Sequence, residues 1–572
     1  MKKLFLFSFL AMAFGVSFGQ VNVVLRGSVD TAVSLASRHR LDSIAALKVN
    51  VADSTVKFLT PTQLGFVAGV IDTAHIPSLD ASKIKSGVID AARIPNAAAP
   101  ATYVISTDGT TVTAHPRAGS GYAVQSGTTA ATVINNAIAA MTGAGTIYFQ
   151  AGTYTISTSI VDNGVDGITL IFESGAKLVA ANALNTGVIH LTNVNNWRII
   201  NPEIDGNSSN QSAPGTPQPN GIWIHAGNNV MVSNPNVYNC REFGVDVDGI
   251  SDNCGVENGI VHDCGWNCVQ LGENTTGTNL FCKHVEVYNA GDVGISTYGR
   301  YTQITDNIVH DITGNNGFNN ARWGIAVETS ATSGNELIRG NKIWNVNVGI
   351  NLAASCDSNL VSENHITNWD SAGSYMPAIW CFSNYNSIQN NVTEKLFNHG
   401  IGITIAGNGA YNFVTNNRHV GTSIGVNLDE NASTNTVSNN WAKSISGDGI
   451  HVNVSTCVGN KIINNDWSQS SSDITDNGVG TIIAGNIYID GLYHATSKSG
   501  SVALVAGTKA ITIAGLTTSS LPFLQLKTPS SASSTIKYQA VCTTNTLTIT
   551  ALVAAGTINA SDVSTIYYSV QN

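Results

Sequence analysis

The stretch GNKIWNVNVGINLAASCDSNLVSENHITN (340–368) contains two copies of one pattern and indicates the fold. In VGINL (348–352), apolar residues alternate with small or polar ones, and the run GNKIWN returns 23 residues later as ENHITN. Alternation with a period of two is typical of a β-strand that buries one side. A single short unit cannot bury that side alone, so the repetition predicts units that stack on one another.

Both runs recur through the middle of the chain at intervals of about 22 to 30 residues. The first recurs as GIWIH (221), FGVDV (243), CVQLG (268), VGIST (293), WGIAV (323), AIWCF (378), GIGIT (400), IGVNL (424) and DGIHV (448). The second recurs as DNIVHD (306), NNVTEK (390), NNRHVG (416), NNWAKS (439), NNDWSQ (464) and GNIYID (485). Each unit carries two or three short strands and no helical pattern, so we predict an all-β, right-handed parallel β-helix.

Asparagine stands at one fixed place in the second run. Asparagine tolerates a left-handed backbone better than other non-glycine residues, so we place each one at the same bend. Their side-chain amides should then stack coil on coil and bond to each other. The predicted ladder is Asn307, Asn341, Asn364, Asn391, Asn417, Asn440, Asn465 and Asn486.

Alternation also assigns the buried side of the first run. The predicted inward residues are Ile222, Ile224, Val245, Val247, Val269, Leu271, Ile295, Ile325, Val327, Ile350, Leu352 and Ile401. Cys240 and Cys264 occupy equivalent places in neighbouring coils and are interpreted as a stacked pair of thiols, with a disulfide as the alternative. Nine cysteines without a C-x-x-C pair indicate neither a disulfide scaffold nor a zinc site.

The segment before the repeats supports this fold by resemblance. Residues 131–141 are predicted to form a short amphipathic helix, and AGTIYFQAGTYTIS (144–157) reads as strand, turn and strand. This segment resembles the opening of the pectate-lyase-like superfamily of right-handed parallel β-helices, in which a capping helix precedes a similar stretch. The resemblance extends to about residue 495 and implies the fold rather than the reaction.

The two ends differ from the middle. Residues 1–19 have a basic start, an apolar run and small residues before a cleavage point, which is typical of a secretory signal peptide, with a buried strand as the alternative. Residues 20–120 contain GVIDTAHIP and GVIDAARIP, which resemble repeats in the shafts of phage tail fibres and tailspikes and imply a homotrimeric stalk; a linker is the alternative. The β-helix is predicted over 121–498 and a small β domain over 499–572.

Composition excludes some partners. Charged residues make up only 11% of the chain, the excess is acidic, and no basic tract exists, so nucleic-acid binding is not expected. No later stretch is predicted to span a membrane. The chain is therefore expected to be secreted or placed at the cell surface.

Candidate site residues follow from the outward positions of the first run. A parallel β-helix has no central pocket, so a polymeric ligand would lie in a groove along one outer sheet. Asp246, Asp248 and Glu273 are the predicted catalytic carboxylates, since paired carboxyl groups at suitable spacing hydrolyse glycosidic bonds. The predicted substrate-binding residues are Trp223, His225, Gln270, Tyr298, Arg300 and Glu328.

One stretch resembles a particular enzyme family. VYNCREFGVDVDGISDNCGVENGIVHDCGWN (237–267) is similar to the catalytic stretch of mannuronan C5-epimerases, and Asp246 matches the first catalytic aspartate. Phe243 stands at the tyrosine position, Asp248 at the histidine position and Asn267 near the second aspartate. Phe243 cannot supply a phenol, so epimerisation or lysis by that mechanism is not expected.

The predicted function is an exported protein that engages polysaccharide along one outer sheet and cleaves glycosidic bonds as a hydrolase or a lyase. The alternative is a non-catalytic adhesin or a tailspike-like receptor-binding protein, in which Asp246 and Asp248 form only a solvated strand face. No cofactor is expected. A calcium site at Asp246, Asp248 and Glu273 is a further alternative, without a loop signature.

Overall fold

The structure is a computed structural model, and it describes residues 101–487 with gaps at 213–217, 274–276, 313, 315–320, 330–332, 370–375 and 396–399. Beyond 487 it describes 493–494, 497–503, 508–512, 521–528, 537–543, 546–552 and 565–571. The predicted signal peptide and the paired GVID repeats lie outside these residues. None of the described helices is long and apolar enough to cross a membrane.

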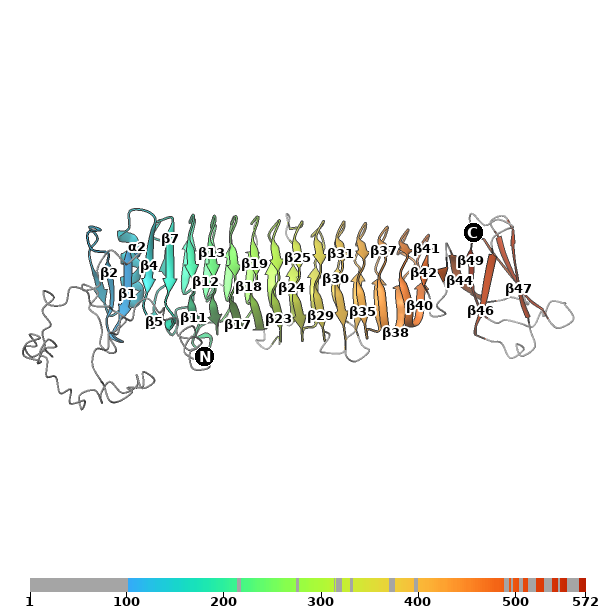
Figure 1. The fold of residues 1–572 in the computed structure, drawn as a ribbon, viewed down its shortest axis with the longest axis horizontal. Helices are drawn as coiled ribbons and strands as arrows, with labels where there is room; N and C mark the ends of the chain where they lie inside the picture. The colour runs from blue at the N-terminus through green and yellow to red at the C-terminus, as the bar shows by residue number, and fades with distance from the viewer. Residues whose placement is uncertain are drawn as a thin grey trace, which may run out of the picture. The chain divides into compact units, whose positions relative to one another are not determined.

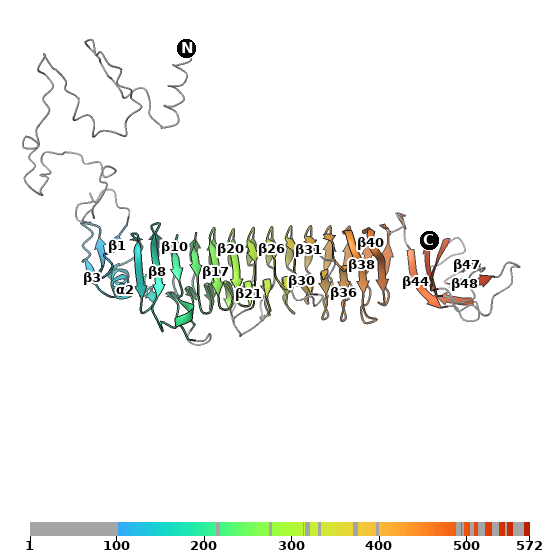
Figure 2. The ribbon, with the colours of Figure 1, turned by 90° about the horizontal axis from the view of Figure 1, so that it is seen from below.

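Each complete coil contributes three strands, which stack in parallel on the strands of the next coil (Figure 1). We call the three resulting stacks face 1, face 2 and face 3, in the order in which the chain meets them from Ile222. Figure 2 shows the same stack from a perpendicular direction. Short strands suffice because every strand of a solenoid pairs with two neighbours. The first sequence run therefore forms face 1, and the second forms face 3.

Face 1 consists of β6 (Ile160–Val161), β9 (Ile189–Thr192), β12 (Ile222–His225), β15 (Val245–Asp248), β18 (Val269–Glu273), β21 (Val293–Thr297), β24 (Trp323–Val327), β27 (Val348–Leu352), β30 (Pro377–Cys381), β33 (Ile401–Ile405), β36 (Ile424–Leu428) and the ends of β38 (Trp441–Val452) and β40 (Asp466–Asp476).

Face 2 consists of β4 (Gly145–Phe149), β7 (Ile168–Phe172), β10 (Arg198–Ile200), β13 (Met231–Ser233), β16 (Gly255–Glu257), β19 (Phe281–Lys283), β22 (Gln303–Thr305), β25 (Leu337–Arg339), β28 (Leu360–Ser362), β31 (Ser387–Gln389), β34 (Phe413–Thr415), β37 (Thr436–Ser438), β39 (Lys461–Ile463) and β41 (Ile482–Ala484).

Face 3 consists of β5 (Gly152–Ile156), β8 (Ala176–Ala180), β11 (Glu203–Asp205), β14 (Asn236–Tyr238), β17 (Ile260–Cys264), β20 (Glu286–Ala290), β23 (Ile308–His310), β26 (Lys342–Trp344), β29 (His365–Thr367), β32 (Val392–Glu394), β35 (Arg418–Val420), the starts of β38 and β40, and β42 (Asn486–Ile487).

The predicted inward residues form continuous columns in register. Ile222, Val245 and Val269 are partners on adjacent strands, and the column continues through Ile295, Ile325 and Ile350. All the predicted inward residues are fully buried except Ile401, for which the prediction is wrong. Ile401 pairs with Pro377 and Ile424 at the strand starts, and Ile403 takes its place in the column.

The asparagine ladder is confirmed. Every predicted member is buried, and each amide nitrogen donates to the next member's Oδ1 at 2.9–3.0 Å, from Asn307 to Asn486. The predicted backbone conformation is wrong, because the left-handed residue is the one before each ladder asparagine. That position holds Asp306, Gly340, Glu363, Asn390, Asn416, Asn439, Asn464 or Gly485. The bend at this residue turns the following amide into the interior.

A second ladder was not predicted. Asn386, Asn412, Asn435 and Asn460 are linked by amide bonds of 2.9–3.2 Å, and Asn359 joins them through its backbone N–H. Each member stands five residues before a member of the first ladder, so the sequence contained the signal. The second ladder lies at the corner between face 1 and face 2, and again a left-handed residue precedes each asparagine.

The described part of the chain begins with a cap. β1 (Tyr103–Thr107) pairs with β2 (Val112–Pro116) in an antiparallel hairpin and with β4 in parallel, and β2 pairs with β3 (Gln125–Gly127). The sheet thus starts before the predicted boundary at 121. Helix α2 spans Ala130–Ala140 and buries Val133, Ile134 and Ile138.

The described strands that follow residue 487 are antiparallel. They are β43 (Tyr493–His494), β44 (Ser497–Ala503), β45 (Thr508–Thr512), β46 (Leu521–Thr528), β47 (Lys537–Thr543), β48 (Thr546–Leu552) and β49 (Thr565–Gln571). The sheet orders β44-β49-β46 and β45-β48-β47 agree with the alternating runs of this segment. All nine cysteines, Cys240 and Cys264 included, are buried free thiols, so the thiol interpretation is confirmed.

Candidate functional site on face 1

The outer side of face 1 carries two parallel rows of side chains. The first, which we call the covered row, contains Trp223, Asp246, Gln270, Ser296 and Ala326, which are partners in register on β12 to β24. From Asp246 to Ala326 this row is at most 1% exposed. A polymer therefore cannot lie on the middle of the covered row in this conformation.

The second row, which we call the open row, stands at the ends of the same strands. His225 and Asp248 are partners on β12 and β15, and Asp248 opposes Glu273 on β18. The register shifts at Asp248 because Gly272 adopts a positive φ of 76° and adds a residue. Tyr298 and Glu328 follow the Thr297–Val327 pair directly, so they continue the row.

Asp248 is the centre of a hydrogen-bonded cluster. Its Oδ1 accepts a bond of 2.8 Å from His225 Nδ1 and one of 3.0 Å from the indole nitrogen of Trp223. Because the carboxylate accepts, the proton of neutral His225 is on Nδ1, and its Nε2 keeps a lone pair. Trp223 stacks on His190 at 4.0 Å between ring centroids. Burial, followed by the nearby His225, lowers the pKa of His190.

Asp246 does not join this cluster. It is fully buried, and its Oδ2 accepts a 3.1 Å bond from the amide of Asn220. Gln270 is held similarly, through a 2.7 Å bond from Asn267. The expectation that Asp246 and Asp248 form one accessible pair is therefore wrong: both side chains leave the same side of the strand, but only Asp248 reaches the open row.

Glu328 is an acid of the open row with a raised pKa. Burial first, and the negative charge of Asp292 second, raise its pKa to about 7. Asp292 is itself buried and accepts bonds from Trp266 Nε1 at 3.2 Å and from the backbone N–H of Ala321 at 2.9 Å. The side chain of Glu328 is half-buried, so it still contacts solvent. Its raised pKa means that the carboxyl group holds a proton near neutral pH.

Arg300 lies away from both rows. It pairs with Thr278 and Gly334 at the corner that leads to face 2, and its guanidinium lies over the ring of Tyr301 at 4.9 Å. It is exposed there, two residues beyond Tyr298. The open row consequently contains no arginine or lysine from His225 to Glu328.

Three neighbours that shape the site were not predicted. His190 lies one coil before Trp223, where alternation in IHLT would have shown it. Asn220 and Asp292 stand just before strands β12 and β21 and reach neighbouring coils, which period-two alternation does not describe. Their roles depend on contacts between coils rather than on local sequence.

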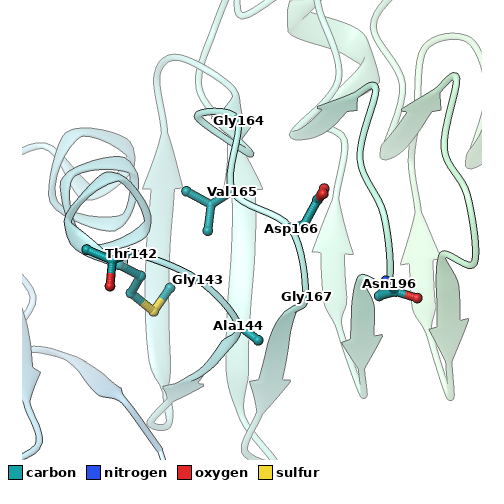
Figure 3. Close-up of a pocket in the computed structure, with 9 residues that line it drawn as sticks. Thr142, Gly143, Ala144, Gly164, Val165, Asp166, Gly167 and Asn196 are labelled. Carbon is teal, nitrogen blue, oxygen red and sulfur yellow. The ribbon is translucent and has the colours of Figure 1, made fainter.

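Other features do not add a site to these rows. A hollow of about 520 Å³ lies between the end of α2 and the loops before β7 and β10, with Val165 and Asp166 in its wall (Figure 3). Asp166 is already bonded to Asn195 at 2.7 and 2.9 Å. Within the described ranges no three His, Cys, Asp or Glu residues group as metal ligands. The side chain of Glu273 lies outside the described atoms, so the calcium alternative stays a prediction.

Comparisons with known proteins agree on the fold. Residues 186–366 match the family described as "Right handed beta helix region", and no curated protein sequence matches the chain.

Similar solved structures include a mannuronan C-5 epimerase module of Azotobacter vinelandii, with 14% identity, TM-score 0.42 and coverage of 60% of this chain and 91% of that one. Another is the Dettilon tailspike protein, with 12% identity, TM-score 0.43 and coverage of 77% and 90%. A third is PfbA, a surface adhesin of Streptococcus pneumoniae, with 12% identity, TM-score 0.39 and coverage of 62% and 90%. The family match and the three-stranded coil together identify the chain as a right-handed parallel β-helix protein, the fold that the resemblance to the pectate-lyase-like superfamily implied.

Proposed function

We propose that this chain is an exported protein that binds a neutral polysaccharide along the open row and hydrolyses its glycosidic bonds. The observation that carries the proposal is Glu328, a half-buried carboxyl group with a pKa raised to about 7, in line with a second glutamate. A general acid works best when its pKa lies near the working pH. Glu328 would thus hold a proton to donate at neutral pH.

The partner of Glu328 in this mechanism is Glu273. β18, β21 and β24 are consecutive strands, so the backbones of Glu273 and Glu328 lie two strand spacings apart, about 9.6 Å. This backbone spacing is just above the roughly 6.5–9.5 Å by which inverting glycosidases separate their two carboxyl groups to leave room for water. Glu328 gives its proton to the glycosidic oxygen as the bond to C1 breaks, and Glu273 takes a proton from the water that attacks C1.

The charge of the row indicates the class of substrate. Asp248, Glu273 and Glu328 are acidic, and the row offers no lysine or arginine to balance a uronate. An acidic polysaccharide would be repelled along this row, whereas a neutral chain would not. Export is proposed from the signal-like pattern of residues 1–19.

Release of reducing ends from soluble neutral polysaccharides tests the proposal. We expect Glu328→Gln and Glu273→Gln each to lower the rate by about 100-fold or more. Glu363→Gln, an exposed glutamate on the loop before face 3, is the matched control and should keep the wild-type rate. The first product should have the inverted anomeric configuration by NMR.

A second candidate reaction is elimination, which the Asp248–His225 bond favours. The free Nε2 of His225 is a suitable base for proton abstraction. Elimination requires a uronate, so it is tested on uronate-containing polysaccharides: products with an unsaturated sugar, absorbing in the ultraviolet and lost in His225→Gln but not in Glu328→Gln, would assign this reaction and an acidic substrate instead. If the wild type forms neither product, the chain is a non-catalytic adhesin or receptor-binding protein.

A further inference from the structure

A group of exposed aromatic rings stands on other coils, away from Asp248 and Glu328. Tyr385 is 58% exposed, Tyr411 48% and Phe413 54%. Tyr385 and Tyr411 lie at the corner between face 1 and face 2 on adjacent coils, and Phe413 is the first residue of β34 on face 2. We call these three residues the aromatic platform. A single exposed aromatic residue is common, but exposed apolar side chains gathered in one patch mark interaction sites.

The backbone under the two tyrosines is strained. Both adopt a positive φ of 59°, in the left-handed region that bulky residues avoid. Other coils fill the same corner position with residues that tolerate this conformation better, such as Asn279, Asn335 and Gly459. The fold therefore does not require tyrosine there. Tyr301 has the same φ but no stacked tyrosine, so it is the strain together with the stacking of Tyr385 on Tyr411 that points to a function of this pair.

The rings are arranged so that flat surfaces remain open. Tyr385 and Tyr411 stack on each other, with centroids 5.1 Å apart and planes 5° from parallel. The equivalent corner residues on either side of the pair are Ser358 and Thr434, which are too small to cover the outer ring faces.

Phe413 is flanked in the same way. Its partners in register on face 2 are Ser387 and Thr436, so small side chains again stand on both sides of the ring. The members of this row beside Phe413, from Leu360 to Thr436, are uncharged, and Lys461 follows Thr436 on the next coil. Open aromatic faces flanked by small uncharged side chains suit the apolar faces of neutral sugar rings.

We propose that the aromatic platform is a second glycan-binding site, specific for a neutral polysaccharide and independent of cleavage on face 1. Tyr385 and Tyr411 stack against sugar rings with their outer faces, and Phe413 supplies a third contact on face 2. The site does not depend on the proposed hydrolysis, since its residues stand on other coils, at the corner beyond face 1 and on face 2.

The test is retention of the full-length protein in gels that contain dextran, laminarin or galactomannan. Every variant carries Glu328→Gln so that cleavage does not alter the probe. We expect Tyr385→Asn with Tyr411→Asn to weaken binding about tenfold or more. The same double variant should melt at a higher temperature, because asparagine relieves the left-handed strain.

The matched control is Tyr301→Asn. Tyr301 has the same corner position and the same φ of 59°, but Arg300 covers its ring and it has no stacked tyrosine. The Tyr301→Asn control should gain thermal stability and keep full retention in the gels. Phe413→Ala is a further test variant and should lose retention. The proposal is overturned if the wild type is not retained by any of the three polysaccharides or if the double variant is retained equally well. A changed sedimentation coefficient in the double variant would also overturn it, by assigning the platform to contact between copies of the chain.

Discussion

His419 is an ionisable side chain inside the solenoid. It occupies an inward position on β35, fully buried, with its Nδ1 2.8 Å from the hydroxyl of Thr393. Burial lowers its pKa to about 3. The unfolded chain therefore takes up a proton near the ordinary histidine pKa of about 6.5, well before the folded protein does.

This difference predicts acid sensitivity. The contribution of His419 to stability is complete above pH 6.5 and falls by about 1.4 kcal/mol per pH unit between pH 6.5 and 3. His419→Gln should flatten that part of the curve of unfolding free energy against pH, measured by urea denaturation. His365→Gln, an exposed histidine on the same face, is the control. Parallel curves for His419→Gln and the wild type would contradict the prediction.

Glu336 should change stability with pH in the opposite direction to His419, lowering it as the pH rises. It heads the second ladder, where its backbone N–H donates to Asn359, and it is 1% exposed. Burial raises its pKa to about 7. Its favourable contribution is complete below about pH 4.5 and is lost as pH rises through 7.

Glutamine is neutral at every pH, so a glutamine at position 336 does not become less favourable for folding as the pH rises. Glu336→Gln should therefore stabilise the protein at pH 8 by an amount on the order of 1–3 kcal/mol and have little effect at pH 4. Thermal unfolding at the two pH values measures this difference. Equal changes at both pH values would contradict the prediction, because they would show that folding does not raise the pKa of Glu336.

At the scale of the element, the stacked amides hold neighbouring coils in register. Asn364 donates to Ile338 O at 3.0 Å and to Asn391 Oδ1 at 2.9 Å, and it accepts from Asn341. Asn364→Leu leaves several buried groups without partners and should cost about 1–3 kcal/mol for each of them. Asn453→Leu, an exposed asparagine outside both ladders, should change stability by less than about 0.5 kcal/mol. The midpoint of thermal unfolding reports both.

The strands show what sequence can and cannot predict. Alternation fixes the direction of side chains along a strand, so Val245, Val247 and the open-row residues His225 and Asp248 were assigned correctly. Alternation contains no information about neighbouring coils. Asp246 is bonded to Asn220 of the preceding coil, so its buried environment could not be predicted from its own strand. Alternation also does not predict where a strand ends and a corner begins. A single left-handed residue before each ladder asparagine bends the chain. Arg300 was predicted to lie in the open row, but the corner begins beyond Tyr298 and places Arg300 outside it.

At the scale of the whole molecule, the repeats near the N-terminus predict assembly. The GVID segments resemble shaft repeats of trimeric fibres, so the mature protein should contain about three chains per particle. Multi-angle light scattering at micromolar concentration measures this number directly. A monomer under these conditions would remove the comparison with tailspikes and leave the fold of the solenoid unaffected.

Glu328 is the proton donor of the proposed hydrolysis, and the pH dependence of polysaccharide hydrolysis tests this role most directly. Deprotonation of the acid should make the initial rate of reducing-end release fall about tenfold per pH unit above pH 7, since only the protonated carboxyl can donate. Glu328→Gln should abolish both the rate and this alkaline limb. A wild-type rate that stays constant from pH 7 to 9, or a Glu328→Gln variant that retains full activity, would contradict the account.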